Sequence, residues 1–460
     1  MVILYSKRIY CDMEINGKLI HFTGIGGVSM SALACFAILN GAYVTGSDQN
    51  TIINKSYLDN LGIISYIGSN PSIAENADIL VYTSAVDEKD KEVRRCREKG
   101  IITLARHEFL SMVAQSYRDV IAISGAHGKT TTTAMLSAIL RKADYPYAAH
   151  VGGHSYDIGG NFYHKGNELF VTEACEYKRS FLSLKPTLSV ILNIDHDHPD
   201  TYKTKEDMVK AFEQFSNNAS ITLAYQEFVS YVPKNEHIIT FGLDNTSDFY
   251  TSNISMYQDE KYKMDICVHE HILIEGIYLP VYGAYNILNA LAAAAAAAMW
   301  GIPPETIKKG LNEYKGVGRR FEIKGKFKDA LIISDYAHHP EEIKATINTA
   351  KKMTKGRLIV IFEPHTFSRT KALIEEFATC FMGADKLIIL PTYAAREYQG
   401  NGMDSHDLLS HIEEKGVLSA DDYYQAREMA LSDIASGDTI LVVGAGTVVK
   451  LADMLCEYNK

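Results

Sequence analysis

The residues best suited to chemistry lie in Ser124-Gly-Ala-His-Gly-Lys-Thr130, between an expected apolar strand that begins at Val120 and a helical pattern. A glycine-bounded turn at a helix start presents backbone N–H groups to an anion, and the helix dipole favours negative charge. Lys129 adds a point charge, and the Thr130 hydroxyl is suited to Mg²⁺. Gly125 and Gly128 are closer together than the glycines of the general Walker pattern. The segment therefore predicts a nucleoside triphosphate site, and an ordinary strand-to-helix turn is the alternative.

A second glycine-rich loop, Gly24-Ile-Gly-Gly-Val-Ser29, also follows an apolar run and opens a helical pattern. It nearly fits GxGxxG, with Ser29 at the third glycine position, and such glycines let the backbone approach a pyrophosphate. Asp48 lies 22 residues beyond Gly26, where an acidic side chain can reach a ribose hydroxyl. The pattern predicts a nucleotide diphosphate site without distinguishing NAD from other nucleotides. Tight helix–strand packing is the alternative.

The length and composition of the chain limit the classes of protein to which it can belong. A chain of 460 residues predicts two or three domains. A net charge of −10 argues against non-specific binding to nucleic acid or membranes, so anionic substrates need local basic groups. The seven cysteines are scattered without a CxxC, which indicates neither a disulfide framework nor a zinc site. Without a signal-peptide layout or an apolar run of membrane-spanning length, a soluble cytoplasmic protein is expected.

Short apolar runs alternate with helical patterns, which predicts an α/β protein built from three units with mostly parallel sheets. The expected strands are 19–22, 43–45, 79–82, 101–104, 169–172, 188–193, 239–241, 330–334, 358–362, 386–390 and 439–443. Residues 246–282 alternate in a way that predicts antiparallel strands at a sheet edge. Candidate functional residues follow strands in every unit: Gly24, Asp48, Ser84, Gly125, Glu173, His198, Asp335, His365 and Thr392. Because ligands bind outside the carboxyl ends of parallel strands, three sites could converge on one cleft.

Nine sequence blocks, in order, make the chain resemble the Mur ligases nearly end to end. They are HFTGIGGVSMSALA at 21–34, VTGSD at 44–48, SGAHGKTTT at 124–132, TEACE at 172–176, NIDHDH at 193–198, GAYNILNA at 283–290, GVGRRFE at 316–322, DYAHHP at 335–340 and EPHTFSRT at 363–370. The resemblance implies three domains: a Rossmann-like UDP-sugar-binding domain over 1–118, a P-loop ATPase-like ATP-binding domain over 119–319, and a Rossmann-like amino-acid-binding domain over 320–460.

The resemblance implies ATP-dependent ligation of L-alanine to the carboxylate of UDP-N-acetylmuramic acid, as a step in making peptidoglycan precursors. The carboxylate would be activated as an acyl phosphate, and ADP and phosphate would be released. The implied cofactors are ATP and Mg²⁺, and the enzyme is expected to be a cytoplasmic monomer or homodimer. Forming an amide in water requires the carboxyl oxygen to become a leaving group, and a lysine, a metal and fixed dipoles serve that chemistry.

The motif positions supply candidate residues for each ligand. ATP binding is expected at Gly125, Ala126, His127, Gly128, Lys129, Thr130, Thr131, Asn286, Asn289, Arg320 and Asp335. UDP-sugar binding is expected at Gly24, Ile25, Gly26, Gly27, Val28, Ser29, Asp48 and Ser84. The expected amino-acid contacts are His338, His365 and Arg369. Lys129, Glu173 and His198 are the expected catalytic residues, and Thr130, Glu173 and His198 are the expected metal ligands.

Several of these assignments have alternatives. Asn286 and Asn289 share a helix face and could pair with a purine edge, or Asn286 could cap the alanine-rich helix. Arg320 is assigned to phosphate and Arg319 to a structural or carboxylate contact, although the order could be reversed. Cys175 stands where the family usually has a carboxylate, which leaves the ligands of a second metal open. A buried structural thiol is the expected role of this cysteine.

Other functions compete with the ligase interpretation. A relative that attaches a murein tripeptide to the same nucleotide is the nearest alternative, although the first glycine-rich loop favours alanine. An NAD-dependent oxidoreductase would use that loop and Asp48 but would leave Lys129 and Glu173 without a purpose. A non-catalytic nucleotide-binding regulator is a third alternative, because residues near Glu173 and His198 depart from the family pattern.

Overall fold

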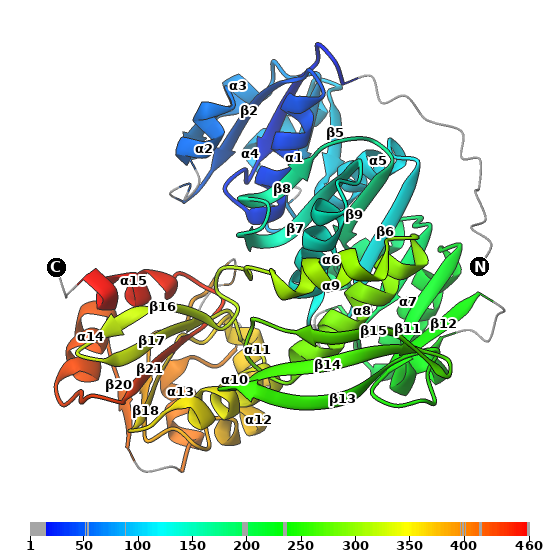
Figure 1. Cartoon of the computed structure of the whole chain (residues 1–460). Coiled ribbons are helices and arrows are strands. Elements are labelled where there is room, and N and C mark those ends of the chain that lie inside the picture. Colours follow the sequence, from blue (N-terminus) through cyan, green and yellow to red (C-terminus); the bar gives the residue numbers. More distant parts are fainter. Residues whose placement is uncertain are drawn as a thin grey trace.

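The computed structural model describes residues 15–457 except 51, 53–54, 88, 196–200, 233–236, 396, 398–399, 401 and 414–415. Three sheets follow one another along the chain and appear as three lobes in Figure 1. No helix of the described residues is long and apolar enough to cross a membrane. The α/β fold class predicted from the sequence is confirmed.

The first lobe is a five-stranded parallel sheet of order β3-β2-β1-β4-β5. Its strands are β1 Leu19–Thr23, β2 Tyr43–Asp48, β3 Ile64–Ile67, β4 Ile79–Tyr82 and β5 Ile102–Ala105. Its helices are α1 Val28–Leu39, α2 Lys55–Asn60, α3 Pro71–Ala74, α4 Lys91–Glu98 and α5 Arg106–Gln115. The strand order reverses between β1 and β4, so the glycine-rich loop after β1 lies at a topological switch point, where nucleotides bind in such sheets.

The central lobe is a ten-stranded sheet of order β15-β14-β13-β12-β11-β10-β6-β9-β7-β8. Its strands are β6 Asp119–Ser124, β7 Tyr147–Ser155, β8 Gly160–His164, β9 Leu169–Glu173, β10 Leu188–Ile191, β11 Ile221–Tyr225, β12 Ile238–Gly242, β13 Phe249–Gln258, β14 Lys261–Val268 and β15 His271–Tyr278. The helices are α6 Lys129–Lys142, α7 Lys205–Asn217, α8 Tyr285–Met299 and α9 Pro304–Asn312, with 3₁₀ turns η1 Tyr177–Ser183 and η2 Gln226–Tyr231. Strand β6 lies between β10 and β9 and is parallel to both, which places the loop after β6 at a second switch point.

The third lobe is a six-stranded sheet of order β16-β17-β21-β18-β19-β20, parallel except for the edge strand β16. Its strands are β16 Glu322–Phe327, β17 Ala330–Asp335, β18 Leu358–Phe362, β19 Lys386–Ile389, β20 Val417–Ser419 and β21 Thr439–Val443. Its helices are α10 Pro340–Met353, α11 Phe367–Ala372, α12 Ile374–Thr379, α13 Ser405–His411, α14 Tyr423–Leu431 and α15 Val449–Glu457.

The first two lobes share one apolar core, whereas the third has cores of its own. Helix α1 packs on β7 and β8, and its Phe36 meets Phe162 with ring centroids 6.3 Å apart. Tyr117 stacks on Phe170 at 4.9 Å. The core residues of the third lobe form separate clusters. The clusters of the third lobe are therefore separate from the core that the first two lobes share.

The predicted strands recur within one to three residues at their ends, and 246–282 contains the antiparallel strands β13, β14 and β15. The sequence missed β3, β7, β8, β11, β16 and β20. Several of these are short or lie at sheet edges, where exposed positions break the apolar run. The domain boundaries near 118 and 320 stay predictions.

Candidate active site

The loop between β6 and α6 has the shape of a phosphate cradle. Gly125 and Gly128 have φ angles of 141° and 85°, which other residues adopt only with strain. Asn193 braces the turn, because its Oδ1 accepts from the backbone N–H of His127 at 2.9 Å and its Nδ2 donates to the carbonyl of His127 at 3.0 Å. A Cβ on Gly128 would collide with Asn289. The loop therefore holds its shape through its own glycines and two neighbouring asparagines.

Lys129 lies at the start of α6 and points back into this turn. Its Nζ donates to the carbonyls of Gly125 and, at 3.1 Å, Ala126. Both carboxylate oxygens of Glu176 lie 3.0 and 3.2 Å from the same nitrogen. Burial opposes the charge, but the neighbouring acidic groups, led by Glu176 and including Cys175 and Glu173, together outweigh it and raise the pKa of Lys129. The lysine is therefore charged, and Glu176 is its counter-ion in the ligand-free chain.

Glu173 and Thr130 offer oxygen atoms next to this lysine. Glu173 ends β9 and accepts from the backbone N–H of Gly152, and a Cβ on Gly153 would lie 3.2 Å from the Thr130 methyl group. Burial raises the pKa of Glu173, opposed by the N–H of Gly152, by Lys129 and by the Thr130 hydroxyl. A carboxylate and a hydroxyl are hard ligands that fit Mg²⁺. His198, the third predicted ligand, lies outside the described residues.

His127 connects the phosphate loop to the third lobe. Its Nδ1 lies 2.8 Å from Glu342 of α10, and its Nε2 lies 3.6 Å from Asp195. Burial opposes protonation, but the two carboxylates outweigh it and raise the pKa of His127 to about 10. Ligand atoms of His127, Asp195 and His339 lie within 4.8 Å of one another. A protonated imidazole has no lone pair for a metal, so this group is an ion-pair cluster at neutral pH.

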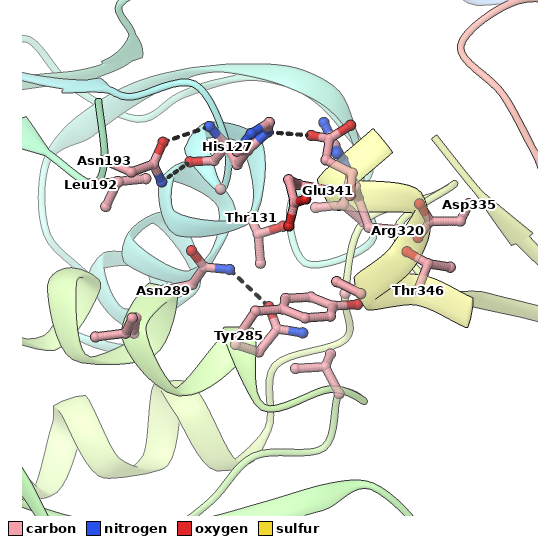
Figure 2. A pocket seen from close by; sticks show the side chains of 18 of the residues that line it. His127, Thr131, Leu192, Asn193, Tyr285, Asn289, Arg320, Asp335, Glu341 and Thr346 are labelled. Atoms are coloured by element: carbon pink, nitrogen blue, oxygen red, sulfur yellow. Dashed lines mark hydrogen bonds and ion pairs between the residues drawn. The ribbon is translucent and has the colours of Figure 1, made fainter. Parts of the chain in front are cut away.

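A cavity of about 260 Å³ opens beside the phosphate loop, between α8 of the central lobe and α10 of the third (Figure 2). Its walls include Tyr285, Asn286, Asn289, Phe241, Leu288, Val281, Arg320, Asp335 and Thr346. Apolar walls with a few convergent polar groups are typical of a site for a nucleotide base and ribose.

The two predicted asparagines lie on one face of α8, inside this cavity. Asn289 donates to Asn286 Oδ1 at 3.0 Å, and Asn286 donates to the carbonyl of Tyr282 at 2.7 Å. The helix is N-capped by Ala284, so the interpretation of Asn286 as the cap is wrong. The hydroxyl of Thr132 in α6 donates to Asn289 at 3.3 Å. These amides tie the cavity to the helix that follows the phosphate loop.

The two adjacent arginines at the junction with the third lobe point in different directions. The guanidinium of Arg319 donates to the carbonyls of Gly444 and Gly446 at 2.6 and 3.0 Å, which is a contact inside the third lobe. Arg320 instead reaches the Thr130 hydroxyl of the central lobe at 3.5 Å. Arg320 therefore points toward the loop after β6, and its assignment to phosphate stays a prediction.

Asp335 organises the chain at the end of β17. Its Oδ2 accepts from the N–H of Phe321 at 2.6 Å, and its Oδ1 accepts from the N–H of Ala337 at 2.7 Å. Burial raises the pKa of Asp335 to about 6. The carboxylate lines the cavity and also holds the turn that places Arg320.

The three residues predicted to bind the amino acid lie together. His338 and His365 meet edge to face with ring centroids 5.8 Å apart, and Arg369 Nη1 lies 3.2 Å from His365 Nδ1. Tyr336 packs on His338 at 5.4 Å, and Tyr393 stacks on His365 at 5.7 Å. The result is a small cationic, aromatic-walled cluster, which suits a free amino acid with its carboxylate on the arginine.

In the first lobe, the predicted glycine-rich loop turns tightly around Asp48. The N–H of Gly26 donates to Asp48 Oδ2 at 2.9 Å, and Gly24 has a φ of 86°. Ile25 is buried, Gly27 is the N-cap of α1, and Val28 begins that helix. The carbonyl of Ser84 accepts from Lys178 Nζ of the central lobe at 3.3 Å. Ser84, which follows β4, therefore contacts the central lobe.

Ser29 is held at that boundary by residues from other elements. His150 Nε2 of β7 lies 2.9 Å from its hydroxyl, and Arg106 Nη1 of α5 donates to it at 3.2 Å. Burial, together with Arg106, lowers the pKa of His150 to about 3. Cys175 is partly buried near Arg106 and Lys129, and burial raises the pKa of its thiol, so its expected structural role stays a prediction.

We predict that His150→Asn removes part of the loss of stability at acid pH. An exposed histidine titrates near pH 6.5, so below that value only the unfolded chain takes up this proton, and stability falls as the pH drops toward 3. Between about pH 6.5 and 5 the loss amounts to about 2 kcal/mol. Urea unfolding of the unaltered protein and of His150→Asn, at neutral and at acid pH, measures this loss of stability. An equal pH dependence of the free energy of unfolding in the two proteins would contradict the prediction.

Comparison with known proteins places each lobe in one family. Residues 19–118 match the profile described as Mur ligase family, catalytic domain; residues 123–297 match the Mur ligase middle domain; and residues 319–446 match the Mur ligase, glutamate ligase domain. The chain belongs to the Mur ligases. The resemblance seen in the sequence motifs is confirmed.

Several relatives of this Mur ligase match it over nearly their whole length. UDP-N-acetylmuramate–L-alanine ligase of Clostridium beijerinckii is 40% identical over 94% of this chain and 96% of its own. The enzyme of the same name from Acetivibrio thermocellus is 39% identical over 96% of both chains. The crystal structure of UDP-N-acetylmuramate–alanine ligase from Thermotoga maritima superposes with a TM-score of 0.81 at 26% identity, covering 96% of this chain and 99% of that one. A murein peptide ligase from Psychrobacter arcticus, at 23% identity and a TM-score of 0.74, shares the fold.

Sequence reasoning missed several polar residues of this Mur ligase site. Glu176 lies in the TEACE motif and Asn193 in the NIDHDH motif, but only Glu173 and His198 of these motifs were predicted as site residues. Arg106 directly follows β5, so the rule that polar residues after strands face ligands could have found it. Glu342 stands three residues after the N-cap of α10 and accepts from two backbone N–H groups there. Its sequence signal is that of a capping residue, and only the fold shows its contact with His127.

Proposed function

We propose that this Mur ligase joins L-alanine to the carboxylate of UDP-N-acetylmuramate and converts ATP to ADP and phosphate. The observation that carries the proposal is the linkage of two sites by Glu342. One of its oxygens binds His127 of the phosphate loop, and the other lies 3.4 Å from His338, which belongs to the cluster with His365 and Arg369. A triphosphate in the loop and an amino acid in the cluster would then meet a carboxylate arriving from the first lobe.

The proposed reaction has two steps. The sugar-linked carboxylate attacks the γ-phosphorus, ADP leaves, and an acyl phosphate forms; the amine of alanine then displaces phosphate. Lys129 and Arg320 would balance the charge of the transferring phosphoryl group, together with the N–H groups of the loop. Thr130, Glu173 and the predicted ligand His198 would hold Mg²⁺, which neutralises phosphate charge when bound. Lys129 would leave Glu176 for the phosphate.

The remaining assignments are part of the same proposal. The cavity lined by Tyr285, Asn286 and Asn289 would take the adenine, and Asp335 would approach the ribose. The loop Gly24–Ser29 would take the diphosphate of the sugar nucleotide, with Arg106 as an added cation. We place the enzyme in the cytoplasm, acting on small molecules, as a monomer or homodimer.

The murein tripeptide ligase activity is the second candidate, and the shared fold of the Psychrobacter arcticus protein favours keeping it in the test. Phosphate release is measured with ATP, Mg²⁺ and UDP-N-acetylmuramate against L-alanine, L-serine, glycine and the murein tripeptide. The proposal expects phosphate only when sugar nucleotide and amino acid are both present, with L-alanine preferred. Release with the tripeptide alone would assign the second activity, and NADH oxidation without phosphate release would point to an oxidoreductase.

Arg369→Ala is expected to raise KM for L-alanine about 10- to 100-fold, because a charge-assisted contact to the substrate carboxylate contributes about 1.5–3 kcal/mol. KM for ATP should stay nearly constant, since the nucleotide cavity does not include this side chain. Arg369→Lys is the control that keeps the charge but loses the fork-shaped donor. Equal changes in both Michaelis constants would remove Arg369 from the amino-acid site.

A further inference from the structure

The boundary between the first two lobes contains a row of hydrogen bonds to which the proposed reaction assigns no role. Its members are Arg106 of α5, Ser29 of α1, His150 of β7 and Thr172 of β9. We propose that Ser29 and His150 are positioning residues, which hold the guanidinium of Arg106 where it binds the diphosphate of the sugar nucleotide. This inference rests on the proposed ligase function.

Ser29 stands where the GxGxxG pattern has its third glycine. A glycine at that position allows a helix to pack closely on a strand, whereas the side chain of Ser29 extends to the neighbouring lobe. Its hydroxyl lies 2.9 Å from Nε2 of His150, and α1 packs on β7 and β8 (Figure 1). His150 is 3% exposed, and a buried imidazole is tolerated when its nitrogens have hydrogen-bond partners. The pair therefore joins the glycine-rich loop to the central sheet.

The donor and acceptor of each hydrogen bond follow from the Thr172 end of the row. The Thr172 hydroxyl donates its proton to the carbonyl of Glu173 at 3.1 Å, so its oxygen accepts from Nδ1 of His150 at 3.0 Å. Burial, together with Arg106, lowers the pKa of His150 to about 3 and keeps the ring neutral. Its Nε2 then has a lone pair and accepts from the Ser29 hydroxyl. The Ser29 oxygen is left to accept from Arg106 Nη1 at 3.2 Å.

Arg106 is suited to binding an anion. It begins α5 directly after β5, at the carboxyl end of the first sheet, where ligands of such sheets bind. Within the part of the chain that the structure describes, its guanidinium has no ion pair, and Ser29 is its one hydrogen-bond acceptor. Because a guanidinium is planar, a hydrogen bond at one nitrogen restricts the direction of the others. The remaining N–H groups match two oxygens of a phosphate.

Other contacts dock α1 on the central lobe. Asn161 of β8 donates to the carbonyl of Val28 and to the hydroxyl oxygen of Ser31, at 2.6 and 3.0 Å. Further along the helix, Phe36 meets Phe162 in the core that the two lobes share. Docking of the helix therefore does not depend on the Ser29 hydroxyl, and its removal separates the orientation of Arg106 from the packing of the lobes.

Binding of UDP-N-acetylmuramate and of UDP, without ATP, tests the role of Ser29. Calorimetric titration compares the unaltered protein with Ser29→Ala, Arg106→Ala and the double variant. Ser29→Ala should raise both dissociation constants about 5- to 20-fold, and Arg106→Ala about 10- to 100-fold, because both ligands carry the diphosphate. In the Arg106→Ala background, Ser29→Ala should have no further effect, since Ser29 acts through Arg106.

Two replacements of different chemistry test His150. His150→Leu should raise the dissociation constant for UDP about 3- to 10-fold, because the Ser29 hydroxyl loses the acceptor that turns its lone pairs toward Arg106. His150→Gln offers an amide oxygen in place of Nε2 and should bind UDP within about twofold of the unaltered protein. Asn161→Ala is the matched control: it should lower the melting temperature and leave the UDP affinity within about twofold. ATP binding should be unchanged in every variant.

The outcomes separate this inference from the proposed function. Failure of the unaltered protein to bind either ligand would contradict the proposed function itself. Equal UDP affinity in Ser29→Ala, or an equal loss of ATP affinity, would overturn the positioning role alone. A loss that persists in the Arg106→Ala background would mean that Ser29 contacts the ligand directly, and a loss confined to UDP-N-acetylmuramate would move Arg106 from the diphosphate to the sugar. Equal losses in His150→Leu and His150→Gln would remove His150 from the role.

Discussion

Lys129→Ala is expected to lower kcat for ligation at least about 10³-fold, because the variant loses the cation closest to the phosphate loop. Binding of UDP-N-acetylmuramate should be nearly unchanged, since the glycine-rich loop that would hold it belongs to another lobe. Calorimetric titration with the sugar nucleotide and a phosphate-release assay measure the two effects. Loss of both in a folded variant would contradict the division of ligands between lobes.

The same substitution has a predictable cost in stability. Glu176 would stay buried but lose the charge of Lys129, and breaking a buried ion pair destabilises a fold by about 3–5 kcal/mol. Adding Glu176→Gln to Lys129→Ala removes that charge and should restore most of the lost melting temperature without restoring turnover. If the double variant melts as early as the single one, the ion pair is not the source of the instability.

Glu173→Gln is expected to lower kcat about 10²- to 10³-fold and to raise the Mg²⁺ concentration needed for half-maximal activity. The amide oxygen can still accept from the N–H of Gly152, so the local fold should be preserved while the metal loses a charged ligand. Activity measured against a Mg²⁺ titration tests this directly.

Gly152→Ala is the matched control for Glu173, because a Cβ on Gly152 would collide with the carboxylate without removing its charge. It should raise the Mg²⁺ concentration needed for half-maximal activity, as Glu173→Gln does, but by a smaller factor. An unaltered Mg²⁺ requirement in both variants would show that Glu173 is not a metal ligand, whatever the loss of activity.

Local sequence patterns were sufficient to predict much of the fold. Strands with continuous apolar runs, such as β6, β18 and β21, were found because parallel strands buried on both faces need such runs. The strands β8 and β16 alternate or expose residues at sheet edges, and their pattern is too weak to be recognised alone. Motif spacing also located the phosphate loop, because the chemistry of the cradle lies in consecutive residues.

The sequence did not predict the contacts of the candidate site that join residues of two lobes. The contact of Arg320 with Thr130 joins residues 190 positions apart, and the contact of His127 with Glu342 joins residues 215 positions apart. Neither pairing has a local signature, and Glu342 reads as a helix-capping residue. The family resemblance supplied several of these positions, but it did not indicate how they contact one another.

The amino-acid sequence by itself determined the fold class, the glycine-bounded turn between β6 and α6 that carries Lys129 and Thr130, and the family of this protein. Those features depend on periodicity and on short-range spacing, which neighbouring residues express directly. Only the tertiary structure decided that Glu176 pairs with Lys129, and that Arg319 points into its own lobe while Arg320 points toward Thr130 of the central lobe. These outcomes depend on distances between segments remote in sequence, and protonation follows from the partners that folding brings within hydrogen-bonding reach.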